Sequence, residues 1–278
     1  MMYMATPQEI HDGTILYRVQ THYDESLQHF PEDQIVGCFL QGSQNYGLDY
    51  EGSDVDTKLI VLPSFDDIAL NRKAVSTTHV RANEEHTDWK DIRLYMETFR
   101  KQNLNFLEIL FTPYCITNPL YREQWMRLVE RREDIARMNE FRAVKSMKGI
   151  AMEKYHAMEH KYPSKVDIID AYGYDGKQVS HLLRVDDYLT RYIAGESYES
   201  CLRPTGALVP RIMDYKRLNV IPLDEAREEA KRVLAHTEAI ADAFCAEHAD
   251  YENPEMRALL EDVSCEIMKI AVKKELGV

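Results

Sequence analysis

Two short apolar runs near the N-terminus constrain the fold more than any other feature of this chain. They are IVGCFL at residues 35–40 and DTKLIVLP at residues 56–63, and we interpret them as neighbouring β-strands. From about residue 120 onward, the apolar residues instead recur at helical spacing within long charged segments. The sequence therefore predicts an α+β protein, with a small mixed sheet followed by a mostly helical C-terminal part.

A junction bracketed by Pro113 and Pro119 divides the chain into two predicted domains, residues 1–118 and 119–278. We interpret residues 64–83 as an irregular insertion. A further strand is expected at 84–90, and helices are expected at 8–30, from Asp91 as N-cap to about 102, from Lys177 to Ile193, at 223–249 and at 254–275.

The composition is that of an acidic globular protein. A net charge of −13 argues against an extensive surface for duplex DNA, although not against binding a short nucleic-acid end. No apolar run approaches the ~20 residues of a membrane span, and the stretch MMYMATPQEIHDG lacks the pattern of a secretory leader. Five scattered cysteines without CxxC spacing argue against a disulfide framework or a zinc site, so we expect a cytoplasmic location. Cys38 is expected to be a buried strand residue.

Residues 40–62, LQGSQNYGLDYEGSDVDTKLIVL, place two aspartates at the start of the second apolar run. If both belong to the strand, Asp54 and Asp56 project from one face, and Val55 points into the core. Paired carboxylates repel each other unless a cation lies between them, and Mg²⁺ prefers carboxylates together with phosphate oxygens and water. The alternative is a solvated turn, because Gly52-Ser53-Asp54 is also ordinary loop composition.

A second pair, Gly42-Ser43, ends the first apolar run and precedes an expected short helix. Free N–H groups at a helix start favour an anion, glycine lets a phosphate approach the backbone, and the serine hydroxyl can donate to it. Ten residues, 44–53, separate this pair from the aspartates. One strand end thus offers a phosphate site and its neighbour offers metal ligands. That is the arrangement needed to hold a metal–nucleoside triphosphate.

The segment GSQNYGLDYEGSDVD resembles the signature of the DNA polymerase beta-like nucleotidyltransferase superfamily, a Gly-Ser pair at a helix start followed by Asp-x-Asp on the next strand. HTDWKDIRLY, NLNFLEILF and AYGYDGKQVSHLLR resemble segments of a predicted branch found in bacteria and phages, some members of which are linked to RNA-ligase repair systems. The resemblance covers most of residues 36–113 and 170–190. It implies a nucleotidyltransferase domain whose nucleotide and acceptor cleft is completed by the helical domain.

The resemblance also implies a third acidic residue on a later strand, which would complete a ligand set for two metal ions. HTDWKD offers Asp88 and Asp91, and Asp91 better suits the N-cap of the following helix. We choose Asp88, with Glu84 as the fallback because it shares the parity of Asp88 along the strand. Asp54, Asp56 and Asp88 would then hold Mg²⁺, or Mn²⁺ in its place. Asp88 would be the candidate general base for an attacking hydroxyl.

The expected helix from Lys177 carries Lys177, His181 and Arg184 at i, i+4 and i+7, within one narrow stripe. Like charges stacked in this way repel, and a bound anion would remove that cost. The segment also resembles the family's Tyr-Gly-Tyr-x-x-Lys…His…Arg pattern, which implies contact with the triphosphate. The alternative is a solvated face with Asp175 and Asp187 as partners.

Two other basic features stay outside the predicted site. Lys58, two residues after Asp56, either reaches a phosphate or is simply a neighbour of the carboxylates. Residues 141–165 carry six Lys or Arg against two Glu, and we interpret this segment as a solvated helix.

The residues and the resemblance together predict a metal-dependent nucleotidyltransferase. Its expected substrate is ATP or another nucleoside triphosphate, and the expected reaction moves the nucleoside monophosphate, AMP in the case of ATP, to a hydroxyl. An RNA end, a protein and a small molecule all remain candidate acceptors. The alternative is a nucleotide-binding regulatory or antitoxin-like module that acts on a protein partner.

Overall fold

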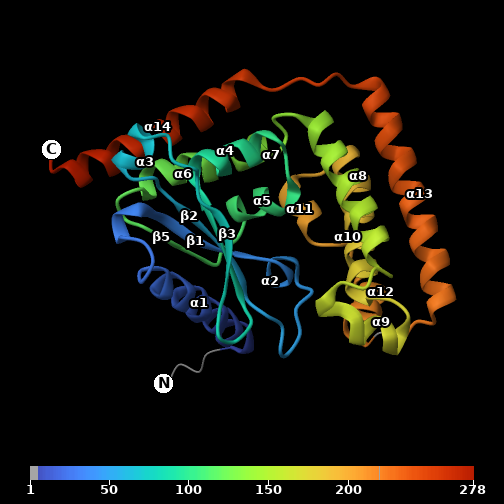
Figure 1. Ribbon diagram of the computed structural model, residues 1–278. Helices are drawn as coiled ribbons and strands as arrows, with labels where there is room; N and C mark the ends of the chain where they lie inside the picture. The colour runs from blue at the N-terminus through green and yellow to red at the C-terminus, as the bar shows by residue number, and fades with distance from the viewer. Residues whose placement is uncertain (1–5, 219) are drawn as a thin grey trace.

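Within the residues that the computed structural model describes, 6–218 and 220–278, a five-stranded mixed sheet forms the N-terminal half (Figure 1). The strand order is β3-β4-β2-β1-β5, where β2 and β4 run parallel and the other neighbours antiparallel. Residues 1–5 of the N-terminal stretch analysed above lie outside the described residues. The strands are β1 (Ile35–Gln41), β2 (Asp56–Val61), β3 (Ser76–Val80), β4 (His86–Asp91) and β5 (Cys115–Thr117).

Helices dominate the rest of the chain, so the predicted fold class, a small mixed sheet followed by a mostly helical part, is confirmed. The α-helices are α1 (Pro7–Ser26), α2 (Ser43–Tyr46), α3 (Phe65–Ala69), α4 (Ile92–Arg100), α5 (Leu104–Leu107), α6 (Arg122–Glu130), α7 (Arg132–Ala136), α8 (Glu140–Ala157), α9 (Val166–Tyr172), α10 (Gly176–Ile193), α11 (Tyr198–Leu202), α12 (Val209–Met213), α13 (Leu223–Glu247) and α14 (Pro254–Leu276). Short 3₁₀ turns are η1 (Glu32–Gln34), η2 (Glu108–Leu110) and η3 (Pro163–Lys165), and η4 (Asp214–Leu218) is a π-helical turn.

Several local predictions were wrong. Residues 64–83 are not an irregular insertion, because they contain α3 and the edge strand β3. The β3 side chains are mostly polar and mostly exposed, so no apolar run marks the strand in the sequence. β5 lies inside the predicted junction and is only three residues long. Helix α1 ends at Ser26 rather than near residue 30. Asp91 is the N-cap of α4, as predicted, and its carboxylate accepts a bond from the Arg93 N–H at 2.8 Å.

Helix α1 covers one face of the sheet (Figure 1). Side chains alternate along β1 and β2, so half of each strand faces this helix. Cys38 is fully buried there, as predicted, and burial raises the pKa of its thiol to about 12. The other apolar residues buried between α1 and the sheet are Ile15, Val19, Tyr23, Ile35, Leu40, Val55, Leu59 and Val61.

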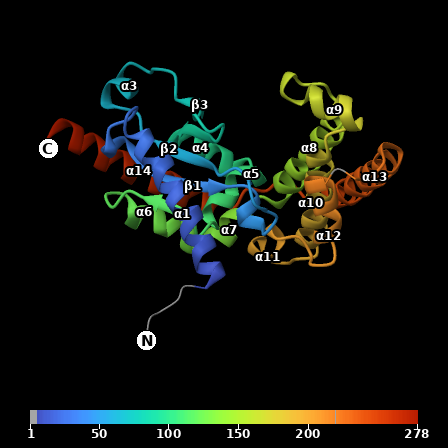
Figure 2. The ribbon, with the colours of Figure 1, turned by 90° about the horizontal axis from the view of Figure 1, so that it is seen from below.

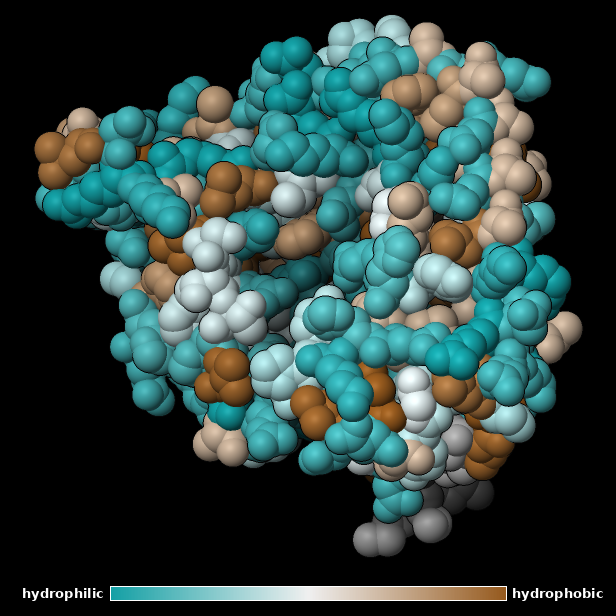
Figure 3. Space-filling model, turned by 45° about the vertical axis from the view of Figure 1, so that its right-hand side comes forward, coloured by the Kyte–Doolittle hydropathy of each residue, from teal (hydrophilic) through white to brown (hydrophobic). Residues whose placement is uncertain are grey.

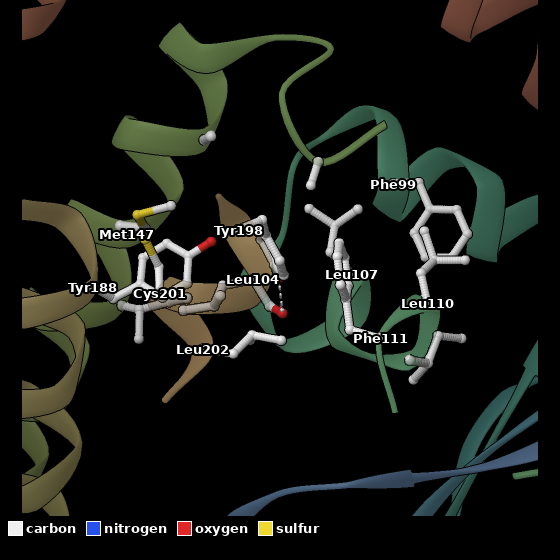
Figure 4. Close-up of a cluster of buried hydrophobic side chains, with 14 of the residues drawn as sticks. Phe99, Leu104, Leu107, Leu110, Phe111, Met147, Tyr188, Tyr198, Cys201 and Leu202 are labelled. Carbon is white, nitrogen blue, oxygen red and sulfur yellow. Dashed lines mark hydrogen bonds between the residues drawn. The ribbon is translucent and has the colours of Figure 1, made fainter. Parts of the chain in front are cut away.

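The opposite face of the sheet carries α4, and its core continues without interruption into the helical half. Figure 4 shows the place where the two halves meet. The rings of Phe111 and Tyr198 are stacked with centroids 4.6 Å apart, and the Tyr198 hydroxyl donates to the Leu104 carbonyl at 3.1 Å. We call this group, Leu104, Leu107, Phe111, Tyr188 and Tyr198, the seam. All five side chains are buried.

Helices α8, α10 and α13 pack side by side in the helical half (Figures 1 and 2). After α13 the chain returns through residues 248–253 to α14, which packs against α4 and α6 beside the sheet. The Asn253 N–H donates to the Met138 carbonyl at 2.7 Å, and Arg100 and Glu252 form an ion pair at 2.7 Å. We call α13, residues 248–253 and α14 the strap. The domain boundary after residue 118 falls between β5 and α6 and stays a prediction.

In the described part of the chain, none of the helices has both the length and the apolar character of a membrane span. The face of the molecule drawn in Figure 3 is mainly hydrophilic, with a hollow near the middle of the view.

The seam yields a stability prediction. Leu107→Ala should lower the free energy of unfolding by about 2–5 kcal/mol, because it leaves a cavity where a side chain is only 1% exposed. Leu120→Ala is the matched control, since Leu120 is 38% exposed, and it should cost less than about 0.5 kcal/mol. Urea denaturation followed by circular dichroism measures both losses. Similar losses in the two variants would contradict a structural role for the seam.

Candidate active site

A cleft of about 460 Å³ lies between the sheet and the helical half. The strand ends of the sheet supply one wall, and α8, α10 and η4 supply the other. Every residue that the sequence placed in the site lines this cleft. These residues are Gly42, Ser43, Asp54, Asp56, Asp88, Lys177, His181 and Arg184.

The acidic wall is formed by Asp54, Asp56 and Asp88. Asp56 is the first residue of β2, so Asp54 lies in the preceding loop rather than in the strand, contrary to the strand-parity argument. Val55 between them is fully buried, as predicted, so the two carboxylates still reach one cleft. Asp56 Oδ1 accepts a bond from the His86 N–H at 2.9 Å, which ties the start of β2 to the start of β4.

Asp88 lies opposite Lys58 in the parallel pairing of β2 and β4. Its carboxylate accepts from the Thr78 hydroxyl at 2.6 Å and pairs with Lys58 Nζ at 3.3 Å. Lys58 Nζ also lies 4.2 Å from the centre of the Phe106 ring. Burial lowers the pKa of the Lys58 ammonium, whereas the Asp88 carboxylate opposes that shift. Lys58 is thus a neighbour of the carboxylates, and its contact with a phosphate stays a prediction.

Glu84, the fallback for Asp88, is in a different position. It has a positive φ of 66° in the turn before β4, where its side chain is exposed. The strand-parity argument does not apply to Glu84, because β4 begins only at His86.

A buried carboxylate that the sequence analysis overlooked holds the aspartate loop in place. Glu85 is 2% exposed, and its Oε1 accepts the Val55 N–H at 3.0 Å, directly between the two aspartates. Arg18 and His22 of α1 both pair with Glu85, His22 through Nε2 at 2.9 Å. No sequence signal distinguishes Glu85 from the adjacent Glu84, because its partners come from a helix more than 60 residues away.

In the Gly42-Ser43 turn, one backbone N–H is already bonded to a buried carboxylate. Gly42 has a φ of 103°, a conformation that favours glycine, and Ser43 begins the one-turn helix α2. The Gly42 N–H donates to Glu108 Oε1 at 3.1 Å, so this group already has a partner within the protein. Gln44 Nε2 donates to the Asp54 carbonyl at 2.6 Å, so the turn and the aspartate loop are directly joined.

Glu108 is the second carboxylate that the sequence analysis missed. It is 2% exposed, and burial raises its pKa to about 8, although the charge of Arg184 and the Gly42 N–H both oppose the shift. Its only sequence signal is a lone acidic residue within the apolar segment NFLEILF.

The basic wall is built on α10. Asp175 is the N-cap of this helix, and its carboxylate accepts the Lys177 N–H at 2.9 Å. The Arg184 guanidinium is 5% exposed and lies 3.9 Å from the centre of the Tyr46 ring, and its Nη1 has no hydrogen-bond partner in the described residues. Burial lowers the pKa of His181 well below its usual value, and neighbouring cations add to the effect, so the imidazole is neutral.

Two more lysines enter the cleft from segments that the sequence did not assign to it. Lys154 of α8 belongs to residues 141–165, so the interpretation of that segment as only a solvated face was wrong at this position. Lys216 of η4 donates to the Leu48 carbonyl at 2.6 Å, and burial lowers its pKa to about 8. Only the folding of the helical half brings these residues to the same cavity as α10.

No protein-family model matches the chain, and neither does any curated protein. Among solved structures, a nucleotidyltransferase-like protein from Exiguobacterium sibiricum 255-15 is similar at a TM-score of 0.28 and 13% identity. The alignment covers 82% of this chain and 75% of that one. A likeness this weak carries no argument about activity.

The Glu85 contacts yield a local prediction. Glu85→Ala should lower the free energy of unfolding by about 3–5 kcal/mol, because it leaves Arg18 and His22 without their buried partner. It should also accelerate hydrogen exchange at the Val55 amide, which loses its acceptor. Glu84→Ala is the matched control. It should change the free energy of unfolding by no more than about 0.5 kcal/mol, and exchange at the Val55 amide should stay as in the parent. Unchanged exchange at Val55 in Glu85→Ala would show that Glu85 does not hold the loop.

Proposed function

We propose that the protein is a metal-dependent nucleotidyltransferase that moves AMP from ATP to a hydroxyl acceptor. One observation carries the proposal. A single cleft has carboxylates along its sheet wall and lysine and arginine side chains along its helical wall. A metal–triphosphate complex needs both kinds of wall, because its cation binds carboxylates while its phosphate oxygens bind Lys and Arg.

The acidic wall suits Mg²⁺ or Mn²⁺ in chemistry, since its donors are carboxylate oxygens. Among residues 6–218 and 220–278, no three acidic, histidine or cysteine side chains are gathered into a ready-made metal site. Mg²⁺ does not require one, because it is usually held by one or two carboxylates plus substrate phosphates. Asp54 and Asp56 would hold the ion on the triphosphate, and Asp88 would join a second. When bound, such ions polarise the phosphoryl oxygens and make a nearby hydroxyl more acidic.

The remaining roles fall to side chains of this chain. Asp88, whose side chain is 30% exposed, takes the proton of the acceptor hydroxyl as a general base. The hydroxyl oxygen forms a bond to the α-phosphorus as the bond to the β-phosphate oxygen breaks, and pyrophosphate leaves. Lys177 and Arg184 neutralise the triphosphate and the departing pyrophosphate. Neutral His181 offers a hydrogen bond rather than a charge.

The acceptor belongs to the same proposal. An RNA end, a protein or a small molecule would supply the hydroxyl, and the net charge of −13 disfavours long duplex DNA. A regulatory or antitoxin-like protein that binds the nucleotide without transferring it is the competing function, and the cytoplasm is the proposed location for either.

The aspartate pair gives the direct test. Asp54→Asn with Asp56→Asn should reduce Mg²⁺-dependent transfer of label from α-³²P-ATP by about 10³-fold, since lost metal stabilisation amounts to several kcal/mol. Asp66→Asn, on the exposed helix α3, should leave transfer unchanged. EDTA should abolish transfer in both the parent and the control.

Label transfer that survives the double substitution would exclude this site. Calorimetric binding of ATP without transfer to any RNA, protein or small-molecule acceptor would instead favour the regulatory function.

The basic wall gives a separate binding prediction. Lys177→Ala should weaken ATP binding about tenfold or more, because a charge-assisted hydrogen bond to phosphate contributes about 1.5–3 kcal/mol. Lys145→Ala is the control, since Lys145 is an exposed lysine of α8 that does not line the cleft. Isothermal titration calorimetry measures both. Equal affinities in the two variants would remove Lys177 from the site.

A further inference from the structure

Two buried polar groups in the cleft are left without partners. Glu108 Oε2 and Arg184 Nη1 have no hydrogen-bond partner in the described part of the chain, so they do not bond to each other. Both side chains are at least 95% buried, and both line the 460 Å³ cleft. A buried polar atom without a partner is costly, and such an atom at a cavity indicates a group that arrives from outside.

The chemistry of the two atoms identifies that group. Glu108 Oε1 already accepts the Gly42 N–H, so a proton on this carboxyl group is carried by Oε2, which then acts as a donor. Arg184 Nη1 is always a donor. Two donors without acceptors, beside Lys177 and Lys216, call for a group that presents several acceptor oxygens and negative charge. A phosphate group has these properties, and a hydroxyl or an amine does not.

We infer that Glu108 binds a phosphate of the nucleotide as a neutral carboxylic acid, through a hydrogen bond donated from Oε2. The inference rests on the proposed function. The pKa of Glu108, about 8, supports the neutral state, because the acid is mostly protonated at neutral pH. Ionised Glu108 would repel the phosphate and lose the donor. The triphosphate would then meet a negative charge beside the Gly42-Ser43 turn, which was expected to attract it.

Among the charged and titratable groups near Glu108, Lys216 has a pKa in the same range as that of Glu108. Arg184 stays charged, and Tyr198 of α11 stays neutral because burial raises its pKa well above 10. His181 stays neutral because its pKa is low. Arg132 of α7 lines a second cavity that Glu108 also borders. Lys216 does titrate near pH 8, so the test must separate its contribution from that of Glu108.

Glu108→Gln makes this separation. The glutamine amide reproduces the neutral acid, with Oε1 accepting from Gly42 and Nε2 donating in place of the carboxyl proton, and it cannot ionise. Lys216 is present in both proteins, so its effect cancels in the ratio of their affinities for ATP. Glu51→Gln, at an exposed position outside the cleft lining, is the matched control.

The experiment titrates full-length parent, Glu108→Gln and Glu51→Gln with ATP and Mg²⁺ between pH 7 and pH 9.5, without acceptor. Inorganic tripolyphosphate is the second probe. At pH 7 the three proteins should bind alike. By pH 9.5 the parent and Glu51→Gln should lose about 30-fold more affinity than Glu108→Gln, because only about one parent molecule in 30 remains protonated. Thermal unfolding verifies that each variant is folded.

Two results would overturn the inference. One is a parallel loss of affinity in parent and Glu108→Gln. The other is weaker binding by Glu108→Gln already at pH 7, which would show that a charged carboxylate is needed. Label transfer from α-³²P-ATP is measured separately. A Glu108-dependent pH profile without transfer would refute the proposed activity and support the phosphate contact.

Discussion

Apolar packing at the seam determines which charged groups of this protein can meet. Leu104, Leu107 and Phe111 bury themselves against the helical half (Figure 4), and this sets α10 opposite the ends of β2 and β4 across the cleft. The same short segment carries Glu108 into the interior. Burial of the apolar neighbours thus gives this carboxyl its unusual environment, because it removes most of the water that would otherwise stabilise the charged form.

The two walls of the cleft take their charged side chains from different parts of the fold. The carboxylates of the aspartate pair come from the start of β2 and the loop before it, whereas all the lining cations except Lys58 come from three separate helical segments, within a protein of net charge −13. Within each wall, side chains of like charge lie close together and repel one another. Ion pairs such as the one between Lys58 and Asp88 only partly offset this repulsion. A ligand that carries both a cation and phosphates would relieve both walls at once.

The sequence predicted those parts of the structure that depend on local pattern. Apolar runs located β1 and β2, helical periodicity located α10 with Lys177 and Arg184 on one stripe, and a short motif located the aspartates. Features that depend on distant partners were missed. Lys216 enters the cleft from a π-helical turn, and Glu85 pairs with Arg18 and His22 of the distant helix α1. β3 was missed because an exposed edge strand has no buried face to leave an apolar pattern.

The strap has a mechanical consequence for the cleft. Because α13 is packed on the helical half and α14 on the sheet half, the chain joins the two walls a second time, far from the seam. The two walls are therefore connected at two separate places and cannot move apart about a single hinge. Wide separation would have to break the seam and the Arg100–Glu252 contact together. A ligand therefore has to enter the cleft without the two walls moving widely apart.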